Sequence, residues 1–167
     1  RGAVMSSPII LVGGGGHCAS CIEVILSSDT YNIFGIIDST DKLNETVLGF
    51  PVIGSDAELL TFKKACRFAL ITVGFVKTPE TRKRLFDSLV QLGYELPVII
   101  ASTAYKSVSC EISNGTILMH RVLVNARTNI GANCIINSKA LVEHDATIGN
   151  NCHIDRKSTR LNSSHGK

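Results

Sequence analysis

A histidine between two carboxylic acids lies near the end of the chain, in Glu143-His144-Asp145. A carboxylate beside an imidazole orients the ring and increases its basicity, which is what a general base requires. His120 occupies the equivalent place of an earlier repeat and is the other histidine of this kind. The spacing leaves two interpretations open for each, a catalytic base and a structural residue.

A glycine run forms the second group of residues suited to chemistry. It consists of Gly13, Gly14, Gly15, Gly16 and His17. Such a turn between a strand and a helix lets a phosphate approach the backbone, and the helix start offers unpaired amides to the anion. Asp38 follows Gly16 by 22 residues, a spacing suited to a ribose hydroxyl. A purely geometric turn is the alternative, and His17 either contacts phosphates or only caps the helix.

The elements that would position these residues alternate between strand and helix. Strands are expected at 8–12, 33–37, 68–73 and 98–100, and helices at 18–26, 55–64 and 79–92. Ser55 and Glu58 form a capping box, Thr78 caps the last helix, and Gly93 ends it. The alternation predicts a parallel, Rossmann-like sheet, whose ligands bind at the carboxyl ends of the strands. The glycine run, Asp38 and Gly74 all lie at those ends.

The second half of the chain repeats every six residues from Cys110 to Ile154, as CEISNG, TILMHR, VLVNAR, TNIGAN, CIINSK, ALVEHD, ATIGNN and CHI. The third place is always aliphatic and the first is small or β-branched. Neither an isolated helix nor a single strand keeps this register, whereas a solenoid does, because each six forms one side of a coil. Three sixes complete a coil, so residues eighteen apart stack at about 4.8 Å. The sequence predicts a parallel β-helix.

Both ends of the chain are expected to be non-native. Asp155 to His165 reads DRKSTRLNSSH, which resembles the translation of a sequencing-library adapter, and residues 1–4 precede Met5. We expect the natural segment to run from Met5 to Ile154 and to stop within the β-helix. The formal net charge then falls from +3 to about −1, because 12 basic and 13 acidic residues remain. This balance predicts no nucleic-acid partner.

The composition predicts a cytoplasmic protein without a membrane span, because no apolar run is long enough to cross a bilayer. Cys18 and Cys21 form a CxxC pair on the first helix, but no second pair follows with zinc-ligand spacing. Packing is the favoured role for both, with a redox or metal role as the alternative. No metal is expected.

The order of these segments resembles the NeuD/PglD-like sugar acyltransferases. The residues that carry the resemblance are GGGGH (13–17), GIID (35–38), AST (101–103) and INSKALVEHDATIGNNCHI (136–154). The chain departs from the family at Cys18, where alanine is usual, at a missing His-Pro pair before the β-helix, and at Lys106, where an aliphatic residue is usual. The resemblance implies a Rossmann-like nucleotide-sugar-binding domain at 5–101 and a left-handed hexapeptide β-helix at 102–154.

The resemblance also implies roles for individual residues. His144 would be the general base with Asp145 as its acidic partner, Asn137 would lie near the acceptor, and His153 near the thioester. The glycine run, Asp38 and Gly74 would form the nucleotide-sugar site. The reaction would be direct acetyl transfer from acetyl-CoA to an amino sugar of a UDP-sugar or to sialic acid, in bacterial surface-glycan synthesis. The site would lie between neighbouring β-helices of a homotrimer.

Three matters stay open at this point. N-acetylation and O-acetylation fit the same base, so the acceptor is undetermined. A non-catalytic trimeric nucleotide-binding subunit and an NAD-dependent oxidoreductase are the alternative functions. This fragment itself is expected to be inactive, because the resemblance places most of the acetyl-CoA site in later coils.

Overall fold

The computed structural model describes residues 5–74 and 79–155. These residues form two compact units, one of 5–74 with 84–97 and the other of 79–83 with 98–155. The first unit therefore ends at Pro97, four residues before the expected domain boundary at 101. The segments expected to be non-native, apart from Asp155, and the expected cap Thr78 lie outside the described residues.

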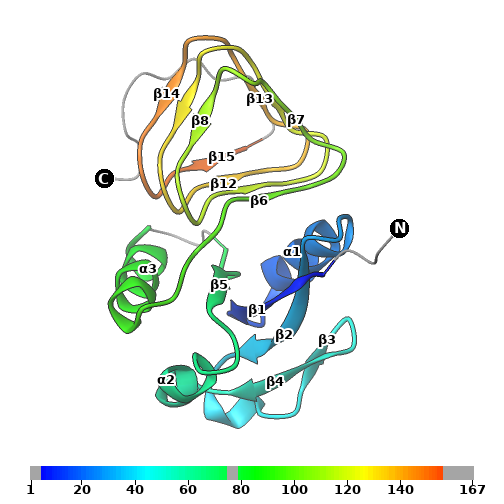
Figure 1. Cartoon of the computed structure of the whole chain (residues 1–167), viewed down its shortest axis with the longest axis vertical. Helices are drawn as coiled ribbons and strands as arrows, with labels where there is room; N and C mark the ends of the chain where they lie inside the picture. Colours follow the sequence, from blue (N-terminus) through cyan, green and yellow to red (C-terminus); the bar gives the residue numbers. More distant parts are fainter. Residues whose placement is uncertain (1–4, 75–78, 156–167) are drawn as a thin grey trace. The chain divides into compact units, whose positions relative to one another are not determined.

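A parallel sheet forms the centre of the N-terminal unit (Figure 1). Its strands are β1 (Ser7–Val12), β2 (Tyr31–Ile37), β4 (Phe50–Gly54) and β5 (Phe68–Ile71), in the order β4-β2-β1-β5, and the short β3 (Thr46–Val47) pairs antiparallel with β4. The helical segments are α1 (Gly16–Leu26), η1 (Thr40–Lys42), η2 (Asp56–Glu58), α2 (Leu59–Phe62) and α3 (Glu80–Leu92). Fully buried aliphatic residues of the central strands, including Ile10 and Ile37, pack with Leu89 of α3 in one apolar core.

The sequence predictions hold for most of this unit. The strands expected at 8–12, 33–37 and 68–73 are β1, β2 and β5. The capping box is confirmed, because the backbone N–H of Ser55 donates to Oε1 of Glu58 at 2.7 Å. Gly93 ends α3 with φ of 92°, a conformation that glycine adopts without steric cost. The β3–β4 hairpin was not predicted, because β3 has only two residues and Pro51 weakens the strand signal of β4.

The strand expected at 98–100 is present but belongs elsewhere. It is β6 (Ile99–Ile100), and it pairs with β9 of the β-helix rather than with the N-terminal sheet. The prediction was wrong about its sheet, because a short apolar run indicates a strand without indicating its partner.

The C-terminal unit is a left-handed β-helix whose coils have a triangular outline (Figure 1). After β6 its strands are β7 (Tyr105–Lys106), β8 (Glu111–Ile112), β9 (Ile117–Leu118), β10 (Leu123–Val124), β11 (Asn129–Ile130), β12 (Ile135–Ile136), β13 (Leu141–Val142), β14 (Thr147–Ile148) and β15 (His153–Ile154). They form three parallel sheets, β13-β10-β7, β14-β11-β8 and β15-β12-β9-β6. Leu123 pairs with Leu141, and the other coils keep the same offset of eighteen residues. The predicted register is confirmed.

The interior of the β-helix is filled from two places of each six. Third-place residues such as Val124 and Val142 are fully buried, and so are first-place residues such as Cys134 and Ala140. Cys134 and Cys152 stack in one column, where the N–H of Cys152 lies 3.4 Å from Sγ of Cys134. All six cysteines are free thiols and buried, so these two pack as small apolar residues.

Each coil turns at three corners, and sixth-place residues make the turns. From Gly115 to Asn151 every sixth-place residue has a positive φ, between 57° and 78°. We name the corners by the pairs stacked there: the basic corner holds Arg121 and Lys139, the histidine corner holds Arg127 and Asp145, and the asparagine corner holds Asn133 and Asn151.

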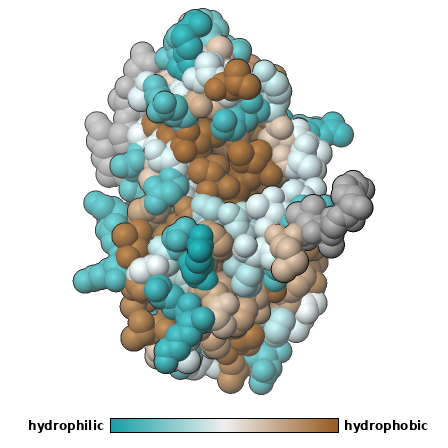
Figure 2. All heavy atoms as spheres, viewed as in Figure 1, coloured by the Kyte–Doolittle hydropathy of each residue, from teal (hydrophilic) through white to brown (hydrophobic). Residues whose placement is uncertain are grey.

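Second-place residues differ between the three sheets: those of β9 and β12 are buried, whereas those of the other two sheets are at least partly exposed. The sheet of β7, β10 and β13 carries an apolar ladder, which consists of Tyr105, Leu123 and Leu141. Tyr105 is 59% exposed and Leu123 40%, so the ladder is open to solvent. Apolar residues are also visible within the outline of the coils when the β-helix is seen along its axis (Figure 2). The sheet of β8, β11 and β14 instead presents Glu111, Asn129 and Thr147.

Candidate active site

The glycine run forms a tight turn at the carboxyl end of β1. Gly13 has φ of 119°, and a Cβ there would lie 2.5 Å from Cγ2 of Val73. Its N–H donates to the carbonyl of Ile37 at 2.8 Å, and its own carbonyl accepts from the hydroxyl of Thr72 at 2.5 Å. Any larger residue at position 13 would therefore strain the backbone and displace Thr72 and Val73, which follow β5.

Asp38 holds this turn from the end of β2. Its Oδ2 accepts the N–H of Gly14 at 2.9 Å, and its Oδ1 accepts the N–H of Ser39 at 2.7 Å. A Cβ on Gly14 would come within 2.9 Å of the same Oδ2. The structure thus brings Asp38 and the glycine run together, as predicted, and gives Asp38 a structural contact that the sequence did not indicate.

The other two glycines leave an open approach to the backbone. A Cβ on Gly15 or Gly16 would meet no atom within 4 Å, and Gly15 caps α1 without any side-chain hydrogen bond. Next to the turn, a cavity of about 290 Å³ is lined by Gly13, Asp38, Ser39, Ser55, Asp56 and neighbouring apolar residues. Open amides at a helix start beside a cavity suit an anionic group.

His17 packs along α1 and against Gly74. Its Nε2 lies 3.2 Å from Sγ of Cys21, one turn further along the helix, and a Cβ on Gly74 would lie 3.3 Å from Cβ of His17. Both cysteines of the CxxC pair are buried, and burial raises the pKa of the Cys18 thiol. The described residues contain no cluster of three or more histidine, cysteine or acidic side chains that could hold a metal ion.

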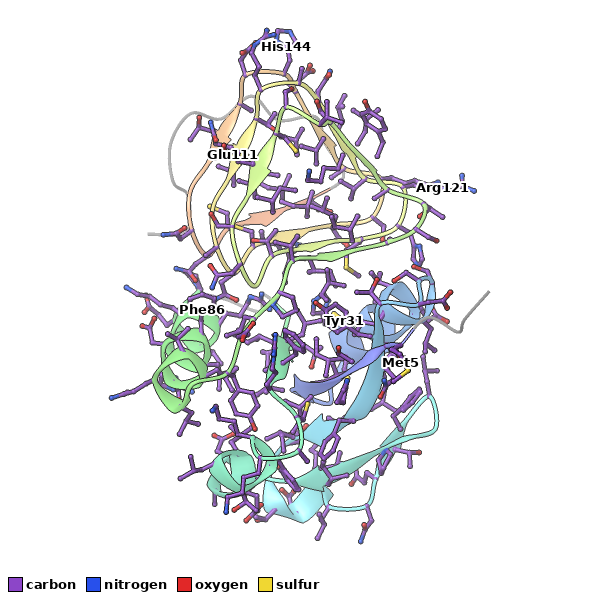
Figure 3. The ribbon with its side chains drawn as sticks, in the orientation of Figure 1. Met5, Tyr31, Phe86, Glu111, Arg121 and His144 are labelled. Carbon is purple, nitrogen blue, oxygen red and sulfur yellow. The ribbon has the colours of Figure 1, made fainter. Side chains whose placement is uncertain are left out.

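The histidine corner brings together the pair that the sequence singled out. Nδ1 of His144 lies 2.7 Å from Oδ2 of Asp145, and the ring points away from the β-helix (Figure 3). Asp145 also accepts two hydrogen bonds from Arg127 of the preceding coil, from Nε to Oδ1 at 2.7 Å and from Nη2 to Oδ2 at 2.9 Å. All three side chains are about half exposed or more.

These contacts determine the protonation of the carboxylate. The hydrogen bonds from Arg127, and then the one from His144, hold the pKa of Asp145 well below its usual range. The carboxylate in turn raises the pKa of Arg127. An ionised carboxylate only accepts hydrogen bonds, so the proton between the ring and Asp145 belongs to Nδ1 of His144. The neutral ring then has its lone pair on Nε2, which is the atom that can take a proton from a substrate.

The other predicted site residues lie at different places on the β-helix. Asn137 is at the basic corner, where its Oδ1 accepts the N–H of Ser138 at 2.9 Å. His153 is on β15, and desolvation lowers the pKa of its ring. His120 is also at the basic corner, and its Nδ1 lies 3.1 Å from Oγ1 of Thr103. A single chain therefore does not bring Asn137 or His153 to the histidine corner.

Arg127 is the residue that the sequence reasoning missed. It precedes Asp145 by eighteen residues and occupies the same sixth place, so the repeat itself places the two side by side. A search for opposite charges at this offset would have identified the pair.

Comparisons with known proteins agree with this arrangement. The family model of the PglD N-terminal domain matches residues 8–89. The structure is similar to PerB from Caulobacter crescentus, solved in complex with CoA and GDP-perosamine, with 30% identity and a TM-score of 0.79 over 90% of this chain and 69% of that one. It is also similar to the acetyltransferase domain of PglB from Neisseria gonorrhoeae, solved with acetyl coenzyme A, with 28% identity and a TM-score of 0.78 over 89% of this chain and 70% of that one. No curated protein sequence matches this one.

A Rossmann-like unit followed by a hexapeptide β-helix with an exposed His–Asp pair, together with these matches, defines an acyltransferase. The chain belongs to the PglD-like sugar acetyltransferase family. None of the helices among the described residues is both long enough and apolar enough to cross a membrane.

Proposed function

We propose that this protein transfers the acetyl group of acetyl-CoA to the amino group of a nucleotide-linked amino sugar, with His144 as the general base. The observation that carries the proposal is the 2.7 Å contact between Nδ1 of His144 and Oδ2 of Asp145 at an exposed corner of the β-helix. The family relationship supports it, because PerB is solved with CoA and GDP-perosamine and the PglB domain with acetyl coenzyme A.

The chemistry follows from the protonation of the ring. Nε2 of His144 takes a proton as the sugar nitrogen attacks the thioester carbonyl, and Nδ1 keeps its hydrogen bond to Asp145. The C–S bond then breaks, the acetyl group stays on nitrogen as an amide, and the departing sulfur takes up a proton to leave as CoA. A backbone N–H at the site stabilises the oxyanion of the tetrahedral intermediate. His153 is proposed to lie near the thioester and Asn137 near the acceptor.

The N-terminal unit is proposed to hold the nucleotide of the acceptor. The amides at Gly15 and Gly16 are open to a pyrophosphate, and Gly13, Gly14, His17 and Gly74 shape the turn around it. Each oxygen of Asp38 accepts one backbone N–H and keeps a lone pair for a ribose hydroxyl.

A homotrimer is proposed as the active assembly. The apolar ladder of Tyr105, Leu123 and Leu141 is open to solvent on one face, and such a face is buried favourably by a second β-helix. Neighbouring copies are needed to complete a site, because one β-helix places Asn137, His153 and His144 apart.

Sedimentation of the wild-type chain and of Leu123→Glu tests the trimer. We expect the variant to lose the trimer, and a monomeric wild type would contradict the proposal.

The function is tested by measuring CoA release from acetyl-CoA with GDP-perosamine, a UDP-4-amino sugar and sialic acid as acceptors. Two proteins are used, the chain itself and a joined protein in which Ile154 is followed by the part of PerB that this chain does not match. We expect the joined protein to release CoA with an amino sugar nucleotide and not with sialic acid, and the chain itself to release none. Release with sialic acid alone would move the proposal to O-acetylation, and no release from the joined protein would reject the enzyme.

A binding assay tests the alternative function. Binding of NAD without binding of a sugar nucleotide would favour an oxidoreductase instead.

A further inference from the structure

The ion pair behind His144 has a geometry that fixes the carboxylate in space. Arg127 donates from Nε to Oδ1 and from Nη2 to Oδ2 of Asp145, at 2.7 and 2.9 Å. Two parallel hydrogen bonds from a planar guanidinium hold a carboxylate in one plane, which a single bond does not do. Oδ2 then has one remaining direction for an acceptor contact, and His144 occupies it.

The pair adds little to the stability of the fold. The side chains of Arg127 and Asp145 are 67% and 49% exposed, so solvent screens their attraction and the pair contributes little to the free energy of unfolding. A bidentate contact at a site with so little to gain in stability suggests another use. The atom that depends on it is Nδ1 of His144, because the tautomer of the ring follows the position of the carboxylate.

We infer that Arg127 is a positioning residue that clamps Asp145 so that His144 is held as the Nδ1–H tautomer, with its lone pair on Nε2. The inference rests on the proposed function for its catalytic consequence, but the geometric part concerns the free protein. Arg127 acts through Asp145 and contacts no substrate in this scheme.

The chain contains a matched control for this residue. Arg121 is also a sixth-place arginine, with φ of 62° against 57° for Arg127, and it lies at the basic corner (Figure 3). Among the residues that the structure describes, no acidic side chain forms an ion pair with Arg121. Arg121→Gln therefore removes the same charge from the same type of turn without touching the histidine corner.

The decisive measurement is the tautomer of His144, read from the ¹⁵N shifts of its ring in the full-length chain at a pH where imidazole is neutral. His144→Gln assigns the signal, and circular dichroism confirms that each variant is folded. We expect Nδ1–H in the wild type and in Arg121→Gln. In Arg127→Gln the share of the Nδ1–H form should fall by at least half, because the carboxylate is free to rotate. Arg127→Lys keeps the charge but not the two parallel bonds, so it should also lose part of the Nδ1–H form.

An unchanged tautomer in Arg127→Gln would overturn the inference. A loss of the Nδ1–H form in Arg121→Gln as well would also overturn it, because the effect would then come from charge alone. If Arg127→Gln fails to fold, Arg127→Lys and Asp145→Asn, which removes the charged acceptor, provide the same comparison.

Kinetics on the joined protein separate this inference from the proposed function. We expect kcat of Arg127→Gln to fall about 5- to 20-fold with KM nearly unchanged, a part of the roughly 10²- to 10⁴-fold that a general base contributes. If Arg127→Gln changes the tautomer of His144 but the wild-type protein is inactive, the clamp is supported and the enzymatic function is rejected. If the wild type is active and Arg127→Gln has the same kcat, the enzymatic function is supported and the clamp is rejected.

Discussion

Two corners of the β-helix have the same backbone and opposite chemistry. The basic corner stacks Arg121 on Lys139, and the histidine corner stacks Arg127 on Asp145, all with the left-handed conformation of the sixth place. His144 directly precedes Asp145 at the histidine corner, and His120 directly precedes Arg121 at the basic corner. The six-residue repeat decides where side chains lie, and the identity of two residues eighteen apart decides what a corner can do.

The asparagine corner gives a third solution at the same place of the repeat. Asn133 is buried, its Nδ2 donates to Oδ1 of Asn151 at 2.8 Å and to the carbonyl of Arg82 at 3.0 Å, and its Oδ1 accepts from Nη2 of Arg82 at 2.9 Å. This corner is closed by hydrogen bonds, whereas the other two are exposed. Its role is therefore stability, in contrast to the chemistry proposed for the histidine corner.

The largest expected effect separates the two fifth-place histidines. In the protein joined to the unmatched part of PerB, His144→Ala should lower kcat by at least about a hundredfold, because the general base is lost. His120→Ala, at the equivalent place of the basic corner, should change kcat by less than about threefold. Steady-state CoA release measures both variants. Equal losses of kcat would show that the two corners do not differ in catalysis.

Next in size is the stability of the asparagine corner. Asn133→Ala should lower the free energy of unfolding by about 2–4 kcal/mol, because buried Arg82 loses hydrogen-bond partners. Asn151→Ala, which loses the single contact to Asn133, should cost about 1 kcal/mol. Urea unfolding followed by circular dichroism compares the two, and a larger cost at Asn151 would show that the Arg82 contact is unimportant.

A smaller effect concerns the pH dependence of the histidine corner. Because Arg127 and His144 lower the pKa of Asp145, the carboxylate should stay ionised as pH falls through its ordinary value, and its contacts should be lost only at more acidic pH. Arg127→Gln should raise this pKa toward the ordinary value, whereas Arg121→Gln should not. A ¹³C titration of the carboxyl signal tests this, and an unshifted midpoint in Arg127→Gln would contradict it.

The smallest expected effect comes from a substitution that makes the basic corner resemble the histidine corner. Lys139→Glu places a carboxylate eighteen residues after Arg121 and builds the ion pair that the histidine corner already has. We expect the free energy of unfolding to rise by about 0.2–1 kcal/mol over Lys139→Gln, since exposed pairs contribute little. Activity should not change. Thermal unfolding at low and high salt measures the difference, and a gain that persists at high salt would not be the expected ion pair.

The periodicity of the sequence was enough to predict most of the β-helix. Aliphatic residues recur at the third place and small residues at the first, and both are buried because a coil has room for only these two columns. The glycine run and Asp38 were likewise predictable, because a parallel sheet gathers the carboxyl ends of its strands at one edge. The partner of β6 was not predictable, because two apolar residues contain no information about which strand lies beside them.

The sequence by itself determined the repeat length, the order of the two units and the identity of the His144–Asp145 pair, since each follows from local periodicity or adjacency. Only the tertiary structure decided that Arg127 grips both oxygens of Asp145, that Asp38 is bonded to the glycine turn, and that Asn137 and His153 lie away from His144 in one chain. The reason is physical: a hydrogen bond depends on the direction of two side chains, and that direction is set by the coil or strand on which each one stands.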